Sequence, residues 1–90
     1  MVPIIKCGSK AVAGSAASIA IDFDVDTENE TTAADFPAGY TVIATGMPDW
    51  ATSVRVSVAP DTTGVTFAFG TACTSTGGIF YWVAYGYKLA

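Results

Sequence analysis

The chain has 90 residues, of which 51% are hydrophobic and 13% are charged, and its formal net charge is −4. A single domain of this size has a small core, so this much apolar side chain exceeds what one monomer buries. The few basic residues form no basic stripe, which excludes a nucleic-acid binder, and no run of about 18 apolar residues would cross a membrane as a helix. We therefore expect one domain over residues 1–90 that forms an obligate oligomer without membrane insertion.

Two strands are predicted in the N-terminal third of the chain. Residues 3–7 form a first apolar run, and residues 8–17 are rich in small residues and are interpreted as a loose turn or edge. Residues 18–25 alternate between apolar and polar side chains, which predicts a half-buried strand. Its inward residues would be Ile19, Ile21, Phe23 and Val25.

The middle of the chain alternates polar loops with short strands. Residues 26–35 are polar and rich in threonine and glutamate, and we expect an exposed, mobile loop there. A turn at residues 36–39 leads into a strand at residues 40–45, and residues 46–52 are interpreted as a loop. Residues 53–59 alternate again, with an inward set of Val54, Val56 and Val58.

The C-terminal third contains a hairpin and an unusual last strand. A turn at residues 60–64 would lead to a return strand at residues 65–69, with Val65, Phe67 and Phe69 inward. The run at residues 78–89 is apolar in both of its alternating sets. The odd set is Ile79, Tyr81, Val83, Tyr85 and Tyr87, and the even set is Phe80, Trp82, Ala84 and Gly86. We expect one set, including Trp82, in the core and the other covered by another copy of the chain.

The cysteines and the N-terminal lysines bear on the cellular compartment. Cys7 and Cys73 are far apart, and a disulfide between them would contribute about 4 kcal/mol in the chain-entropy model. Lys6 and Lys10 interrupt the apolar region that a signal peptide needs, so we expect no secretion signal. We therefore expect reduced cysteines that act as small buried apolar residues.

These elements predict an all-β fold of five or six antiparallel strands, most economically a two-sheet sandwich. Three segments resemble the C-terminal tip domains of phage tail fibres, which carry Ile-Ile-Gln-Trp-Gly, a Phe-Pro-x-x-Tyr turn and a terminal Tyr-Trp-Ile-Ala-Ile-Gly-Tyr. The matching segments here are Ile4-Ile5-Lys6-Cys7-Gly8, Phe36-Pro37-Ala38-Gly39-Tyr40 and Tyr81-Trp82-Val83-Ala84-Tyr85-Gly86-Tyr87. Cys7 departs from the pattern, because it stands where the fibre domains have tryptophan. The order of elements also resembles H-type lectin domains.

The resemblance implies an H-type-lectin-like β-sandwich of about six strands that assembles as a homotrimer. It further implies a location in the virion, at the tip of a fibre or spike, in contact with other virion proteins and with a host surface glycan or receptor. A structural virion protein that decorates or stabilises the capsid is the alternative, motivated by the small size, the apolar surface and the lack of a preceding shaft. A free soluble lectin is a third possibility.

Catalytic and metal chemistry are poorly supported. The chain has no histidine, so Ser-His-Asp and Cys-His arrangements are absent, and we expect neither an enzyme nor a cofactor. Acidic residues alternate from Asp22 to Glu30, which resembles the start of an EF-hand loop, but Thr27 and Ala33 replace the required Gly and Glu. A solvated acidic face is the favoured interpretation. A Ca²⁺ site at a trimer axis is the alternative, with weak candidates Asp22, Asp24 and Asp26.

Five residues are candidates for ligand binding. Trp50 lies on a predicted loop, where its ring could stack on a sugar while Asp49 binds the hydroxyls, or where it could cap the sandwich. Arg55 projects outward from its strand and could bind a ligand or pair with an acid of a neighbouring chain. Tyr85 and Tyr87 suit an interface or an exposed rim.

Overall fold

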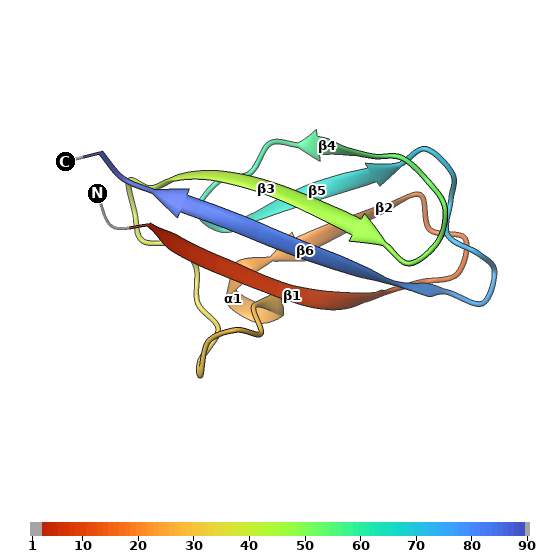
Figure 1. The fold of residues 1–90 in the computed structure, drawn as a ribbon, viewed down its shortest axis with the longest axis horizontal. Coiled ribbons are helices and arrows are strands. Elements are labelled where there is room, and N and C mark those ends of the chain that lie inside the picture. The colour runs from red at the N-terminus through yellow and green to blue at the C-terminus, as the bar shows by residue number, and fades with distance from the viewer. Residues whose placement is uncertain (1–2, 90) are drawn as a thin grey trace.

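Six strands and one helical turn make up the computed structural model, which describes residues 3–89 (Figure 1). The elements are β1 (Ile4–Val12), β2 (Ser18–Asp22), α1 (Phe23–Asp26), β3 (Thr41–Pro48), β4 (Val54–Val58), β5 (Gly64–Phe69) and β6 (Gly78–Tyr87). The predicted all-β class with about six strands is confirmed.

The strands form two antiparallel sheets of three strands each. Sheet A has the order β1-β6-β3, and sheet B has the order β2-β5-β4. The last strand, β6, therefore lies in the centre of its sheet between β1 and β3, as Figure 1 shows in blue between red and green. Within residues 3–89, no helix is long and apolar enough to cross a membrane.

The inner faces of the two sheets meet in one hydrophobic core. Phe80 and Ala84 on β6 are fully buried and Trp82 is 3% exposed, so the even set of the last strand forms the core as expected. Phe67 on sheet B lies with its ring centroid 5.0 Å from that of Phe80 on sheet A. The buried set of β5, namely Val65, Phe67 and Phe69, also confirms the sequence prediction.

The second predicted strand is wrong in its last residues. It ends at Asp22, and residues 23–26 form a helical turn instead. The Asp22 carboxylate accepts the Asp24 N–H at 3.0 Å as an N-cap, and the Asp26 carboxylate accepts the Asp22 N–H at 2.8 Å. Phe23 still reaches the core, but Val25 is 70% exposed rather than inward. Local side-chain capping thus overrides the alternating pattern.

Strands β1 and β3 are longer than predicted. Residues 8–12 were expected in a loose turn or edge, and they continue β1, an edge strand, which pairs with β6 as far as Val12. Residues 46–48 were expected in a loop, yet they continue β3. Position 46 of this strand is a glycine because the Phe80 ring occupies the place of a side chain there: a Cβ would lie 2.0 Å from the Phe80 Cζ. Small residues here mark close packing rather than turns.

Strand β4 corrects the prediction for its valines. Val54 is half-buried and packs against the core, whereas Val56 is 42% exposed at the sheet edge. The register shifts between Val56 and Val58, so that Val58 lies opposite Thr66 and is 59% exposed. One irregularity therefore moves Val58 to the other face of the sheet.

The two cysteines lie on different sides of sheet A. Cys73 is buried in the core, and Cys7 is half-buried on the side of β1 that faces away from the core. Both thiols are free. The expectation of two buried cysteines is thus correct for Cys73 and wrong for Cys7.

Candidate functional site

The main surface feature of the molecule is the face of sheet A that points away from the core. We call it the outer face of sheet A. It consists of the odd-numbered residues of three strands: Ile5, Cys7, Ser9 and Ala11 on β1, Thr41, Ile43, Thr45 and Met47 on β3, and Ile79, Tyr81, Val83, Tyr85 and Tyr87 on β6. It carries no charged side chain.

Strand register places the large apolar residues of this face side by side. Tyr81 on β6 lies opposite Met47 on β3, and Tyr85 lies between Ile5 and Ile43. The exposed fractions are large: 69% for Met47, 59% for Ile43 and 52% for Tyr81. A shallow hollow of about 300 Å³ between β3 and β6 is lined by side chains that include Met47 and Tyr81. Monomeric proteins rarely leave such a continuous apolar surface in water.

Tyr85 and Tyr87 are part of this outer face. Both are half-buried, and their ring centroids lie 6.1 Å apart. Their neighbours across the strands are Ile43 and Thr41. The two tyrosines therefore extend the apolar face at one end of β6.

Asp49 and Trp50 lie at the opposite end of β6 and serve the packing of the fold. Asp49 exchanges two hydrogen bonds with Ile79: its N–H donates to the Ile79 oxygen at 2.9 Å, and its carboxylate accepts the Ile79 N–H at 3.1 Å. The Trp50 ring packs edge-on against Phe69 at 4.8 Å, and its indole N–H donates to the Thr71 oxygen at 3.1 Å. Trp50 thus caps the end of the sandwich, the alternative given for it from sequence.

Arg55 lies on the other sheet. It is exposed on β4, opposite Ala68 of β5, and faces away from the core. The five candidate ligand-binding residues therefore occupy three separate regions: the end of the sandwich, the outer side of sheet B and the outer face of sheet A. The structure does not bring them together into one site.

The acidic segment has structural roles. Asp22 and Asp26 hold the helical turn, and Asp26 also pairs with Lys10 at 2.8 Å. Within residues 3–89, no group of three or more Asp, Glu, Cys or His side chains lies close enough to hold a metal ion. The calcium interpretation of Asp22, Asp24 and Asp26 therefore gains no support, because their carboxylates are spread over a helical turn.

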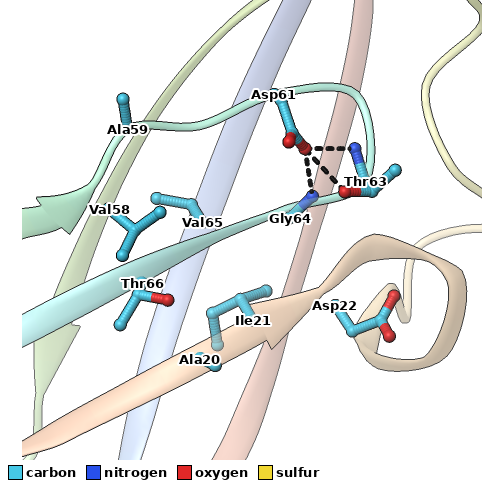
Figure 2. A pocket seen from close by; sticks show the side chains of 10 residues that line it. All are labelled: Ala20, Ile21, Asp22, Val58, Ala59, Asp61, Thr63, Gly64, Val65 and Thr66. Carbon is cyan, nitrogen blue, oxygen red and sulfur yellow. Dashed lines mark hydrogen bonds between the residues drawn. The ribbon is translucent and has the colours of Figure 1, made fainter.

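A hollow of about 260 Å³ lies over β2, β5 and the end of β4, on sheet B (Figure 2). Ala20, Val58 and Thr66 line one part of it, and Asp22 and Asp61 line the other. Asp61 accepts hydrogen bonds from the Thr63 hydroxyl at 2.6 Å and from the N–H groups of Thr63 and Gly64. These bonds, the hydroxyl first, lower the pKa of the Asp61 carboxyl, which therefore stays ionised.

No protein-family model, no curated protein and no solved structure matches this chain. Sequence reasoning missed the residues that β1 and β3 contribute to the outer face of sheet A, above all the exposed Ile5, Ile43 and Met47. Their pattern alone does not reveal which strand pairs with β6. One sequence feature could have indicated them: no residue from Thr41 to Met47 is charged, which is unusual for a strand at the edge of a sheet.

Proposed function

We propose that this chain is a self-assembling β-sandwich of a virion and that its copies pack through the outer face of sheet A. One observation carries the proposal: this face has no charge and exposes Ile43, Met47 and Tyr81 by more than half. Obligate interfaces are apolar surfaces of this kind, and burying them removes apolar area from water.

The placement in a virion rests on the resemblance to phage fibre tips. Two of the three matching segments, at Ile4–Gly8 and Tyr81–Tyr87, lie on β1 and β6 and therefore contribute to the proposed interface. The same resemblance favours a homotrimer in which the outer faces of three A sheets surround a common axis. The core on the other side of each sheet would remain within one chain.

The mass of the particle in solution tests the assembly. We expect multi-angle light scattering of the purified chain at micromolar concentration to give three times its 9.2 kDa, or a multiple of that. Val83 lies in the middle of the outer face of sheet A and is 38% exposed. Val83→Lys places a charge in the apolar contact between copies and should therefore reduce the mass. Val58→Lys is the matched control, because Val58 is 59% exposed on sheet B and should leave the mass unchanged. A monomeric wild type would overturn the proposal.

Attachment to a host-surface glycan is a second candidate function. The hollow on sheet B favours it, because this surface stays accessible when the outer face of sheet A is buried. We expect the assembled protein to adhere in a glycan array or a cell-binding assay. Ala20→Arg, which places a long side chain in the hollow, should abolish that adhesion without changing the mass. No adhesion, together with several hundred copies per particle, would instead support a structural role on the capsid.

A further inference from the structure

The edge strands of the sandwich differ in how their outward backbone groups are treated. On β1, the Asn29 side chain accepts the Cys7 N–H and donates to the Ile5 oxygen, both at 2.8 Å. The Glu28 N–H donates to the Cys7 oxygen at 2.8 Å, and the Glu28 carboxylate accepts the Ser9 N–H. The free edge of β1 is therefore occupied by the chain's own loop.

The two edges of sheet B are protected in other ways. On β2, the Lys10 ammonium donates to the Ala20 oxygen, and the Asp22 N–H donates to the Asp26 carboxylate, both at 2.8 Å. Strand β4 is short, carries Arg55 and has an irregular register between Val56 and Val58. Bulges, charges and short length are the features by which proteins prevent edge-to-edge pairing.

Strand β3 has none of these protections. Its eight residues carry no charge and pair with β6 without a register shift. Within residues 3–89, no loop or side chain forms a hydrogen bond to the backbone on its other side. It is therefore an open edge, in which Thr41, Val42, Ile43 and Thr45 are β-branched residues that favour strands, and it ends at Pro48.

The ladder geometry identifies the open groups. The Asp49 N–H donates to the Ile79 oxygen, and this pair continues the β3–β6 register. In an antiparallel ladder, bonded residues alternate, so Met47, Thr45, Ile43 and Thr41 bond to β6. The backbone groups of Val42, Ala44 and Gly46 must then point away from β6. Pro48 is on the same side, where its missing N–H costs nothing.

From these contacts we infer that β3 pairs with β3 of a second copy, antiparallel, about a two-fold axis at Ala44. Val42 then bonds with Gly46 of the second copy, Ala44 bonds with itself, and two A sheets become one six-stranded sheet. A second copy of the chain is the partner we infer, because β3 has no charged side chain that would repel the same strand of another copy. Pairing with β1 or β2 of another chain is blocked by the hydrogen bonds that these edges already have. Because a two-fold contact uses the same strand of both copies, it ends with two chains and leaves no further β3 edge open. It is independent of the face packing proposed above.

Amide hydrogen exchange by NMR tests this pairing in the wild-type protein. The N–H groups of Ile43 and Thr45 bond to β6 and should be protected in any state of assembly. We expect the N–H groups of Val42, Ala44 and Gly46 to be protected as well, and to lose protection on dilution. If these three exchange as fast as exposed loop amides while Ile43 and Thr45 stay protected, the inference is overturned, whether or not the face packing exists.

The mass of variants separates the two contacts. Ala44→Pro removes an outward N–H and spares the β3–β6 ladder, whereas Ala44→Val adds similar bulk and keeps that N–H. With both contacts, the mass is six times 9.2 kDa, and Ala44→Pro should halve it. A wild type of twice 9.2 kDa supports the edge contact if Ala44→Pro makes it monomeric while Val83→Lys does not, and the reverse result contradicts the edge contact. A wild type of three times 9.2 kDa also contradicts the edge contact. A fall in mass with Ala44→Val equal to that with Ala44→Pro would also count against the edge contact.

Discussion

The Lys6 ammonium lies 2.8 Å from the Glu30 carboxylate, and the Lys6 side chain is only 3% exposed although it belongs to an edge strand. The ammonium also lies 5.2 Å from the centroid of the Phe36 ring. Lys6 thus fastens the loop after α1 to the inner side of sheet A. This loop is the one whose Glu28 and Asn29 close the free edge of β1.

Removing Glu30 should destabilise the protein more than removing Lys6. Glu30→Gln leaves a buried ammonium without its counter-ion, which costs about 3–5 kcal/mol in a fully buried pair. Because Glu30 is 30% exposed, solvent screens part of this cost, and we expect a loss of about 2 kcal/mol, below the range for a fully buried pair. Lys6→Met removes the charge and keeps the apolar stem, so its cost should be smaller. Urea unfolding measures both, and equal costs would contradict the assigned burial.

Asn29 should control access to the β1 edge. Asn29→Ala removes the donor to Ile5 and the acceptor for Cys7, and we expect a loss of about 1–2 kcal/mol. Asn29→Asp is the matched control, because it keeps the acceptor and loses only the donor. We expect Asn29→Ala to aggregate faster on heating than Asn29→Asp, as measured by light scattering. The reverse order would show that the loop does not guard this edge.

Trp82 should be essential through its volume rather than its indole N–H. It is 3% exposed and its ring lies 5.6 Å from that of Phe23, so Trp82→Ala should cost about 3–5 kcal/mol and prevent soluble assembly. The indole nitrogen is buried without a hydrogen-bond partner among residues 3–89. Trp82→Phe therefore loses no hydrogen bond and should retain a folded, assembled protein. Thermal melts and mass of both variants check this; a soluble assembly with Trp82→Ala would contradict it.

Asp61 should link stability to acid pH. Hydrogen bonds from Thr63 and Gly64 lower the pKa of its carboxyl in the folded state. Its contribution is therefore present above the unfolded value of about 3.9 and is lost as the pH falls through the lowered folded pKa. We expect NMR titration to place the pKa of the Asp61 carboxyl in the folded protein below the unfolded value of about 3.9. In Asp61→Asn, the melting temperature should fall less steeply below pH about 4 than in the wild type.

The sequence could predict the elements whose side chains alternate and whose faces differ. Strand β5, the turn before it and the even set of β6 follow from the local pattern, because burial of Val65, Phe67 and Phe69 on one face is a property of the strand alone. The helical turn at residues 23–26 could not be predicted in this way. The alternating pattern at these residues equally favours a strand, and the turn depends on hydrogen bonds that the Asp22 and Asp26 carboxylates accept from the backbone. The bulge in β4 was missed for a related reason: its valines alternate in sequence, and the register shift exists only relative to β5.

The apolar last strand by itself determined that one of its faces is in the core and that the other is left apolar, because neither alternating set is polar. Only the tertiary structure decided which strands flank it. By pairing β6 with β1 and β3, the fold adds Ile5, Ile43 and Met47 to the apolar face, and it leaves β3 as the open edge. It also separates Asp49 and Trp50 from Arg55 and from the tyrosines, since pairing order depends on contacts between residues far apart in the chain, which no local pattern encodes.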